Sequence, residues 1–372
     1  MAHVRSVLFV TYHFPPEIGG IQTRISRYVR ELGRRGIAVT VFVLTSHGSE
    51  ARRYKMEGSD VVVLPGNLQF FVRNSLYLLR AVISSRVDVI HVFTGAQTYF
   101  GIFSLLVGRV KGIPSVISFF GKEQFVTENA AQKALLPFSL SLATSIAVNT
   151  PHTQGFVPAV YAKKGYVLLG GADMSEPVGA HSGFHFGETK TILFVGRLVE
   201  RKGVDDLVKA FPLVRDAFPG TRLVIIGDGP ERKQLEVLAR SLGVDTSVEF
   251  RGALTGEPLQ VAYEESSVVA LPSKYVKTDP ATEGLGLTLI EASMHAKPLV
   301  GTLHGGIPEI ITDGLNGFLV SEDNPEELAA ALTRILSDKE LAKRMGKAAL
   351  QMAEAKFTWE AATNRLLECY SR

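Results

Sequence analysis

The sequence predicts an α/β protein of two doubly wound domains, each with a parallel sheet covered by helices on both faces. Three observations predict this fold. Short apolar runs alternate with amphipathic helical stretches, the alternation recurs in the second half, and 372 residues exceed what one ordinary hydrophobic core holds. Strands that alternate with helices form βαβ units, whose strands lie parallel in one sheet.

The first half of the chain alternates predicted strands with predicted helices. Each strand is a run rich in Val, Ile, Leu or Phe, as expected for a strand that is buried on both faces. Each helix has apolar residues at helical spacing. We expect strands at 7–12, 39–44, 61–64, 87–92, 115–119 and 146–148, and helices at 21–34, 76–84 and 99–110.

The second half repeats this scheme after a segment, 170–189, that is rich in Gly and polar residues. Weak periodicity there predicts the domain boundary. We therefore expect an N-terminal domain at 1–175, a second domain at 185–355, and a separate C-terminal helix at 356–372. Strands of the second domain are expected at 191–195, 223–226, 248–250, 268–271 and 299–302.

Composition excludes several classes of protein. A hydrophobic content of 46% and a charged content of 21% are typical of a globular chain and exclude a disordered one. No run of 18 uncharged apolar residues predicts a membrane-spanning helix, and the N-terminus lacks the pattern of a signal peptide. Cys369 is the single cysteine, so an internal disulfide and a cysteine-based metal site are excluded. We expect a cytoplasmic location.

Charge is divided unevenly between the two halves. Residues 1–170 contain 18 Lys and Arg against 8 Asp and Glu, a net charge of +10, whereas the rest of the chain contains 22 against 29, a net charge of −7. Such asymmetry predicts that the first half meets an anionic partner or surface.

The first predicted helix carries Arg24, Arg27, Arg30 and Arg34 at steps of three, three and four, which predicts one broad basic face. An aromatic and basic stretch follows at 70–80. This combination suits a peripheral contact with an anionic membrane surface, at the inner face of the cell membrane, although a solvated basic helix explains the charge equally well. Nucleic acid is not an expected partner, because no recognition motif accompanies the charge.

Two carboxylates eight residues apart, Glu283 and Glu291, flank a Gly-Leu-Gly turn that opens an apolar helix. If most of this span is helical, the two backbones lie roughly 10–12 Å apart. The catalytic carboxyls of a glycosidase are closer, at about 5 Å in retaining and at most about 9.5 Å in inverting enzymes. Free N–H groups at a helix N-terminus suit a diphosphate, so the segment predicts a nucleotide-sugar site.

The motifs around this pair follow one another in a recognisable order. They are Pro272-Ser273, the Glu283–Glu291 segment, Lys297-Pro298 after a run of small residues, Gly305-Gly306-Ile307-Pro308-Glu309, and Asp313-Gly-Leu-Asn-Gly317. This order resembles that of the retaining glycosyltransferases of family 4, and the resemblance extends over nearly the whole chain. It implies the GT-B fold, which is two Rossmann-like domains with a cleft between them.

The resemblance also implies that the C-terminal helix packs back on the N-terminal domain, with Trp359 as its anchor; ordinary core packing of Trp359 is compatible with this. One residue departs from the family pattern, because Ala296 stands where relatives usually have Gly before Lys297-Pro298. We expect its methyl group to change only packing.

On the donor side, the resemblance assigns Arg197 and Lys202 to the departing nucleoside diphosphate, whose charge they stabilise. Glu283 is implied to hold hydroxyls of the transferred sugar, and Glu291 to hold the ribose. Other residues are implied to lie along the donor: Gly229 beside the ligand, Arg251 where the backbone meets the base, and Gly284, Leu285, Gly286, Leu287 and Thr288 at the phosphates.

On the acceptor side, the Gly19-Gly20 loop is implied to face the donor. Many relatives have His before Gly121, where this chain has Phe120, and a phenyl ring cannot accept a proton or donate a hydrogen bond. Retaining members are thought to use the leaving phosphate as the base, so activity need not depend on that His. Lys122 and Glu123 are the nearest polar candidates.

Three histidines have open roles. His13 and His91 end predicted strands, where a structural role and an acceptor contact are both possible. His304 precedes Gly305-Gly306 and is expected near the donor.

Together these observations predict a retaining hexosyltransferase that moves a sugar from a nucleoside diphosphate sugar to an acceptor hydroxyl. The chain contains no Asp-x-Asp triplet, so we expect chemistry without a metal or other cofactor. The favoured acceptor is a membrane lipid or a lipid-linked glycan, because the first domain is basic. A soluble acceptor, a sugar-nucleotide epimerase and a non-catalytic homologue remain alternatives.

Overall fold

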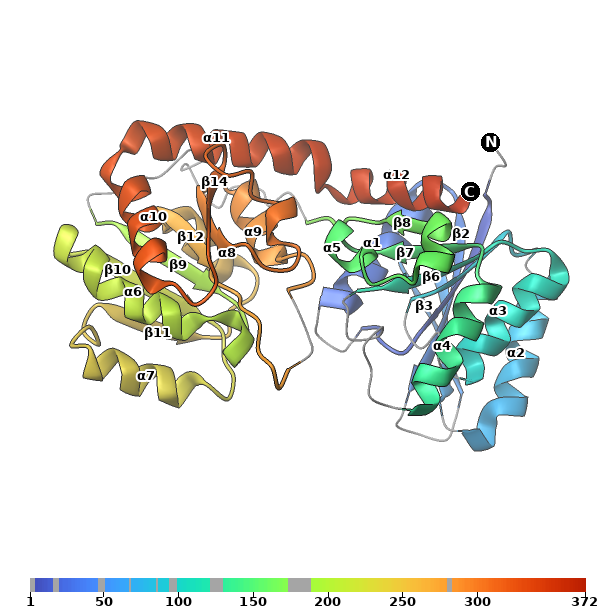
Figure 1. Ribbon diagram of the computed structural model, residues 1–372. Coiled ribbons are helices and arrows are strands. Elements are labelled where there is room, and N and C mark those ends of the chain that lie inside the picture. The colour runs from blue at the N-terminus through green and yellow to red at the C-terminus, as the bar shows by residue number, and fades with distance from the viewer. Residues whose placement is uncertain are drawn as a thin grey trace. The chain divides into compact units, whose positions relative to one another are not determined.

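The computed structural model describes residues 4–15, 20–45, 51–66, 68–84, 86–93, 99–120, 130–172, 189–279 and 283–372. The chain divides into two compact units, and each is an α/β domain (Figure 1). The first unit contains Met1–Gly171 together with Trp359–Arg372, and the second contains Ala172–Thr358. None of the described helices is both long enough and apolar enough to cross a membrane.

The first unit is built on an eight-stranded sheet with the order β3-β4-β2-β1-β5-β6-β7-β8. All its strand pairs are parallel except β3–β4 at one edge. The strand predicted at 115–119 is confirmed to the residue. The strands are β1 (Ser6–Thr11), β2 (Ala38–Thr45), β3 (Arg52–Met56), β4 (Ser59–Pro65), β5 (Val89–Val92), β6 (Ser115–Phe119), β7 (Ser145–Val148) and β8 (Gly165–Val167).

The helices of the first unit cover the two faces of this sheet in separate sets. Residues on one face, such as Leu8 and Val10, pack in a core with α2, α3 and α4. The alternate residues, such as Val7 and Phe9, pack with α1 and α12. The helices are α1 (Gly20–Arg34), α2 (Phe71–Ser84), α3 (Tyr99–Lys111), α4 (Ala130–Leu142), the short α5 (Pro151–Gln154) and α12 (Trp359–Tyr370).

The C-terminal helix α12 is part of the first unit's core. Trp359 meets the ring of Tyr28 on α1 edge-on, with the ring centroids 5.9 Å apart. Fully buried His91 on β5 bonds through Nδ1 to the Tyr370 hydroxyl at 2.8 Å and through Nε2 to Ser118 Oγ at 2.7 Å. Of the two roles left open for His91, the structure therefore shows the structural one.

His91 gives the first unit a pH dependence. Burial lowers the pKa of His91 to about 3, from an ordinary value near 6.5. Between about pH 3 and pH 6.5 the unfolded chain binds a proton at His91, whereas the folded chain does not. The free energy of unfolding therefore rises with pH over this range. The variant His91→Gln keeps hydrogen-bonding capacity but does not titrate. Below about pH 6.5 we expect it to lose less stability than wild type on acidification, the difference growing by about 1.4 kcal/mol per pH unit. Denaturant unfolding of both proteins across this range measures the difference; parallel curves would contradict it.

Two strands of the first sheet were not predicted from the sequence, because they lack an apolar run. The edge strand β3 reads Arg-Arg-Tyr-Lys-Met and its first four residues are exposed. It pairs with β4 through a turn in which Glu57 and Gly58 both have positive φ. Charged side chains on an edge strand protect it from pairing with other chains, so polarity is expected there. The other missed strand, β8, has three residues.

The second unit is built on a six-stranded parallel sheet with the order β11-β10-β9-β12-β13-β14. The strands predicted at 191–195, 268–271 and 299–302 are confirmed to the residue, while β14 was not predicted. The strands are β9 (Thr191–Val195), β10 (Arg222–Ile226), β11 (Val248–Gly252), β12 (Val268–Leu271), β13 (Leu299–Thr302) and β14 (Gly317–Val320).

Helices follow the strands of this sheet in the doubly wound manner. They are α6 (Val204–Ala217), α7 (Arg232–Ser241), α8 (Glu257–Glu265), α9 (Leu287–Met294), α10 (Pro325–Ser337) and α11 (Lys339–Lys356). The helix α6 packs against α7 and α10, and α9 packs against α11 (Figure 1). The strand order reverses between β9 and β12, and ligands of such sheets bind at the carboxyl ends of the strands that flank this point.

Ala296 follows α9 in a left-handed conformation, with a φ of 53°. Its N–H bonds to the Ser293 carbonyl at 2.9 Å, and the next N–H bonds to the Ala292 carbonyl at 3.1 Å, as at many helix C-termini that carry Gly. The expectation that its methyl group changes only packing is therefore wrong. An L-residue in this conformation stores about 1–2 kcal/mol of backbone strain.

We expect Ala296→Gly to stabilise the second unit by about 0.5–1 kcal/mol, because relieved strain exceeds the extra chain entropy that Gly brings to the unfolded state. Ala330→Gly on the exposed side of α10 is the matched control, and should destabilise by about 1 kcal/mol. Denaturant unfolding measures both changes. Equal destabilisation by the two substitutions would contradict the prediction.

Candidate active site

The loops that follow β9 and β12 meet at the point where the strand order reverses. The loop after β9 ends in a 3-10 turn, Glu200–Lys202, and Gly203 with a φ of 63°. A Cβ on Gly203 would lie 1.9 Å from the Pro272 carbonyl oxygen in the loop after β12. This close approach requires glycine and brings Lys202 beside the second loop.

A buried cluster of three side chains joins these loops. Lys202 Nζ lies 2.5 Å from Glu283 Oε2, and Ser273 Oγ donates to the same oxygen at 2.9 Å. Burial acts to raise the pKa of Glu283, but the charge and hydrogen bond of Lys202 and the hydrogen bond of Ser273 outweigh it and hold the pKa below its ordinary range. Glu283 is therefore an ionised acceptor at neutral pH.

Glycines fix the backbone of Glu283 from the other side. Gly305, with a φ of 56°, would place a Cβ 2.2 Å from the Glu283 carbonyl oxygen. The N–H of Gly306 donates to this oxygen at 2.9 Å. The paired glycines after β13 thus have a physical reason, which is to let the chain close around Glu283.

Lys274 anchors the loop that carries Ser273. Its ammonium group lies 2.8 Å from Asp206 Oδ2 and 3.0 Å from Asp205 on α6, and 3.1 Å from Asp323 Oδ1 after β14. Burial acts to lower the pKa of Lys274, but its hydrogen bonds to Asp206 and Asp205 raise it above its ordinary value. Sequence reasoning missed this anchor, because no pattern joins residues so far apart.

Arg197 differs from Lys202 in its surroundings. Its side chain is exposed at the end of β9 and forms no hydrogen bond or ion pair within the part of the chain that the structure describes. An unpaired guanidinium on the same loop as Lys202 is free to meet an anion. Of the two cations that stand five residues apart in the sequence, Lys202 is therefore paired with Glu283 and Arg197 is unpaired among the described residues.

The predicted phosphate-binding segment leads into α9. Gly286 is the N-terminal cap of this helix in a left-handed conformation with a φ of 71°, Leu285 is buried, and Gly284, Leu287 and Thr288 are half-buried. The helix begins only at Leu287, so residues 283–286 are not helical. The separation of 10–12 Å between the backbones of Glu283 and Glu291, which was expected for a mostly helical span, therefore does not apply. The roles of these residues toward a phosphate stay predictions.

Glu291 lies on α9 and is held by a side chain that sequence reasoning missed. The buried Tyr263 of α8 donates its hydroxyl to Glu291 Oε2 at 2.8 Å. Burial, and then the Glu291 carboxylate, raise the pKa of Tyr263 well above its ordinary value. Tyr263 stands within an ordinary amphipathic helix, and nothing in its spacing indicated this contact.

Gly229 follows β10 and touches the loop after β9. A Cβ on Gly229 would lie 2.3 Å from the Leu198 carbonyl oxygen. Its N–H donates to Asp228 Oδ1 at 2.7 Å, and Asp228 Oδ2 lies 3.5 Å from Arg232 Nη1. The loop itself therefore requires glycine here, whereas the predicted approach to a ligand stays a prediction.

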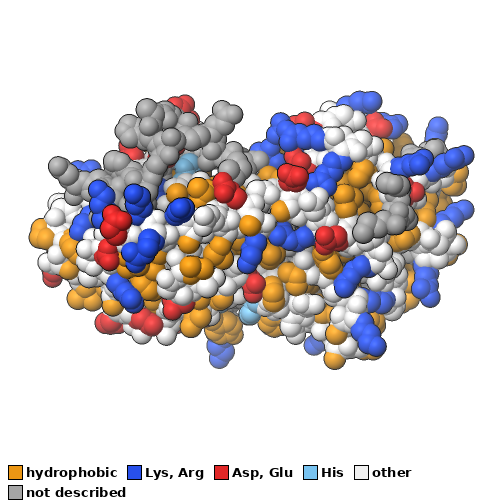
Figure 2. All heavy atoms as spheres, turned by 90° about the horizontal axis from the view of Figure 1, so that it is seen from above, with side chains coloured by type: hydrophobic (Ala, Val, Ile, Leu, Met, Phe, Trp, Pro, Cys, Tyr) orange, Lys and Arg blue, Asp and Glu red, His pale blue; other side chains and the backbone are white. Residues whose placement is uncertain are grey.

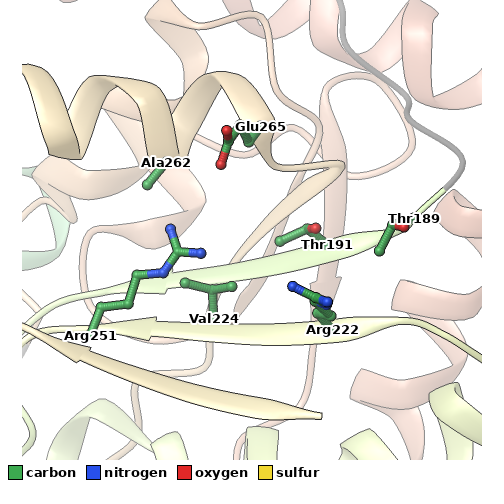
Figure 3. A pocket seen from close by; sticks show the side chains of 7 residues that line it. All are labelled: Thr189, Thr191, Arg222, Val224, Arg251, Ala262 and Glu265. Atoms are coloured by element: carbon green, nitrogen blue, oxygen red, sulfur yellow. The ribbon is translucent and has the colours of Figure 1, made fainter.

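The side chain of Arg251 lies apart from the cluster. Its guanidinium pairs with Glu249 at 3.0 Å and lines a pocket beneath α8 (Figure 3). That pocket also contains Thr191 and Arg222, the first residues of β9 and β10, so it reaches the edge of the sheet opposite the cluster. The expectation for Arg251 concerned its backbone, and this stays a prediction.

Lys297 of the Lys-Pro motif is fully buried and donates Nζ to the carbonyl oxygen of Glu264 at 2.7 Å. Burial lowers its pKa to about 8. Lys297 therefore ties the end of α9 to the end of α8, and its role is structural.

His304 is buried and bonds through Nδ1 to Glu322 Oε1 at 2.8 Å. Its neighbour in sequence, Gly305, packs on the backbone of Glu283. The expectation that His304 lies near the donor stays a prediction.

On the first unit, Phe120 directly follows β6 and is half-buried. Its ring stacks on Phe93 with centroids 6.3 Å apart, and the guanidinium of Arg24 lies 5.2 Å from its centroid. Asn149 Nδ2 donates to the Phe120 carbonyl at 2.7 Å. Among the other acceptor-side predictions, Gly19, Lys122 and Glu123 lie outside the described residues, and Gly20 begins α1.

The arginines of α1 do not form the exposed basic face that their spacing predicted. Arg24 is buried against Phe120, and burial lowers its pKa. Arg30 lies 3.6 Å from Glu57, and Arg34 lies 2.7 Å from Glu31. The basic face expected on α1 is therefore wrong: it is part buried and part neutralised.

Across the described ranges, from 4–15 to 283–372, no group of three or more His, Cys, Asp or Glu side chains is gathered as a metal site would require. Chemistry without a metal stays a prediction.

Comparison with known proteins extends these observations. Residues 18–162 match the model of "Glycosyltransferase Family 4", and residues 181–352 match that of "Glycosyl transferases group 1". The GDP-mannose-dependent alpha-(1-6)-phosphatidylinositol monomannoside mannosyltransferase of Mycobacterium tuberculosis is 28% identical over 97% of each chain. The corresponding enzyme of Corynebacterium glutamicum, described as acting on the monoacylated monomannoside, is 26% identical over 98% of each chain.

Solved structures show the same fold at low sequence identity. Sucrose-phosphate synthase from Thermosynechococcus elongatus superposes with a TM-score of 0.77 at 20% identity, covering 99% of this chain and 98% of its own. A glycosyltransferase from Rickettsia africae gives a TM-score of 0.78 at 17% identity, covering 98% and 97%. Family models match both halves of the chain, and the solved structures share its fold, which is the GT-B fold. The chain therefore belongs to the family 4 glycosyltransferases.

Proposed function

We propose that this glycosyltransferase moves a hexose, with retention of configuration, from a nucleoside diphosphate sugar to a hydroxyl of a lipid-linked or membrane-presented acceptor. The observation that carries the proposal is the buried cluster of Lys202, Glu283 and Ser273, together with the exposed Arg197 on the same loop as Lys202. It lies at the carboxyl end of the sheet where the strand order reverses, which is where such sheets bind ligands.

The charges of this cluster fit both ends of a sugar diphosphate. An ammonium group has three hydrogen-bond donors, and Lys202 directs one of them to Glu283. Its remaining donors and the guanidinium of Arg197 are available to phosphate oxygens, where cations stabilise the negative charge of the departing diphosphate. Glu283 is ionised and accepts hydrogen bonds, as a carboxylate that holds sugar hydroxyls must.

The relatives support a particular donor and class of acceptor. Two mannosyltransferases that align over nearly their whole length are named as GDP-mannose-dependent and as acting on phosphatidylinositol mannosides. We therefore take GDP-mannose as the first donor to test, and a glycosylated membrane lipid as the first acceptor. A lipid acceptor also agrees with the net charge of +10 in residues 1–170, since the cytoplasmic surfaces of membranes are anionic.

The first experiment is a thermal-shift series with GDP, UDP, ADP and their sugars. Wild type is compared with Arg197→Ala and with Arg240→Ala, whose arginine is exposed on α7. Bound ligand adds about 2.7 kcal/mol of stability at a hundred times its dissociation constant, so a true donor is readily detected. We expect one nucleotide to stabilise wild type and Arg240→Ala but not Arg197→Ala. No stabilisation of a folded wild-type sample by any nucleotide would overturn the proposal.

The donor identified in this way is then supplied in labelled form with lipid extracts and with soluble sugars. Label in the lipid phase supports the proposed acceptor class, and the anomeric configuration of the product tests retention. Transfer to a water-soluble sugar alone would overturn the acceptor, and conversion of the donor without any acceptor would indicate an epimerase.

A further inference from the structure

Three neighbouring helices of the first unit expose an unusually apolar surface. Helix α3 packs against both α2 and α4, and the inward sides of all three lie on one face of the sheet (Figure 1). Their outward sides carry large apolar residues that are exposed to solvent. We define the α2–α4 surface by the side chains of Val72, Leu76, Ile83, Leu106, Val110 and Phe138.

The helix α2 is apolar on its exposed side as well as on its buried side. Leu78 and Val82 are buried in the core of the first unit. Val72, Leu76 and Ile83, which are 72%, 62% and 66% exposed, follow one another at steps of four and seven and so lie on one side. The exposed side of a surface helix in a water-soluble domain is usually polar, so the apolar exposed side of α2 is suited to being covered.

The charges of the three helices have one sign. Within their residue ranges, α2, α3 and α4 contain five Lys or Arg and no Asp or Glu. Arg80, Arg109, Lys111 and Lys133 form no ion pair with any residue that the structure describes. On the face shown in Figure 2, by contrast, Asp and Glu side chains lie among the Lys and Arg side chains. Cations on the α2–α4 surface are therefore available to an anionic partner.

We propose that the α2–α4 surface binds the surface of an anionic lipid bilayer. Exposed aliphatic and aromatic side chains enter the boundary between headgroups and acyl chains, while the surrounding cations meet anionic headgroups. A second copy of the chain is a poor occupant, because two such surfaces would oppose cations without any carboxylate. The inference deepens the proposed function, on whose membrane-presented acceptor it rests. Of the two segments expected to meet a membrane, it keeps the stretch at 70–80, which is largely α2, and replaces α1 by α3 and α4.

Flotation with lipid vesicles tests the inference on the full chain. The vesicles contain phosphatidylcholine alone or phosphatidylcholine mixed with phosphatidylglycerol. Wild type should float with the mixed vesicles and far less with the neutral ones. Leu76→Ser combined with Val110→Ser should weaken binding about tenfold, because two exposed aliphatic side chains no longer enter the lipid. Arg80→Gln combined with Lys111→Gln should weaken it about fivefold per cation at low salt.

A matched control distinguishes binding by the α2–α4 surface from non-specific binding of any exposed aliphatic side chain to lipid. Leu213→Ser combined with Val237→Ser removes two exposed aliphatic residues from α6 and α7 of the second unit, and should float like wild type. Equal flotation of wild type and the α2–α4 variants would overturn the inference, as would loss of binding in the control alone. Concentration-dependent dimers that the Leu76→Ser and Val110→Ser changes abolish would show that a second copy covers the surface, and would overturn it too.

Donor binding measured on the same samples distinguishes the two proposals. If a nucleotide stabilises wild type but wild type does not float with vesicles, the proposed membrane binding is refuted and the proposed sugar transfer is not. Flotation without any nucleotide stabilisation would refute the proposed transfer and leave the surface intact.

Discussion

Replacing Lys202 by methionine is expected to reduce the rate of sugar transfer by about 10²–10³-fold, because one preorganised cation at a developing anion is typically worth this much. Methionine keeps most of the length of the lysine side chain and removes its charge. The measurement is a transfer assay with the donor found by thermal shift, at saturating donor, so that a change in affinity does not hide the change in turnover.

Lys202→Met is also expected to destabilise the second unit by about 3–5 kcal/mol. Glu283 is 8% exposed, and without Lys202 its carboxylate is buried beside Ser273 with no ion pair. An uncompensated buried charge of this kind carries such a cost. The pKa of Glu283 should then rise, because the largest influence that lowers it is lost.

The double variant Lys202→Met with Glu283→Gln separates the two effects. Both charges are removed, so the free energy of unfolding should recover most of the loss, whereas transfer should stay as low as in the single variant. Ser273→Ala is a milder comparison, which removes one hydrogen bond to Glu283 and should cost about 1 kcal/mol. Near wild-type transfer by the stable double variant would contradict a catalytic role for the cluster.

Much of the second unit could be predicted from the sequence because its strands are continuous apolar runs between clear turn signals. The runs at 191–195, 268–271 and 299–302 have no other plausible structure, and their ends place Lys202 and Ser273 at one edge of a parallel sheet. The ion pair of Lys202 with Glu283 was not predicted, because Lys202 was assigned to the diphosphate and Glu283 to sugar hydroxyls. The contacts of Tyr263 and Lys274 were not predicted either, since each depends on where a side chain points within an otherwise ordinary element.

The error on α1 has a simple geometrical cause. At roughly 100° per residue, Arg24 lies about 60° from Arg27 and about 120° from Arg30 around the helix axis. This rotation brings Arg24 toward the stripe of buried Ile25 and Tyr28, which packs on the sheet. Steps of three and four keep neighbouring residues together, but the shift accumulates over several of them, and a series of arginines then crosses from the surface into the core.

Replacing Gly305 by alanine is the second change expected to have a large effect. The added Cβ would lie 2.2 Å from the carbonyl oxygen of Glu283 and 3.2 Å from its Cβ, so Glu283 must move. The left-handed φ of 56° adds about 1–2 kcal/mol of strain. We expect stability to fall by more than this strain alone. Transfer should fall by about 10²-fold, because displacement of a positioning group by about 1 Å can cost this much.

Gly243→Ala supplies the control for Gly305→Ala, because it reproduces the strain without the clash. Gly243 ends the turn after α7 with a φ of 64°, and a Cβ there would meet nothing within 4 Å. It should lose about 1–2 kcal/mol of stability and no transfer activity. Denaturant unfolding and the transfer assay, applied to both variants, separate strain from displacement. If Gly305→Ala lost no more activity than Gly243→Ala, the close approach of Gly305 to Glu283 would not position the carboxylate for its role, and Glu283 would have to be held by Lys202 and Ser273 alone.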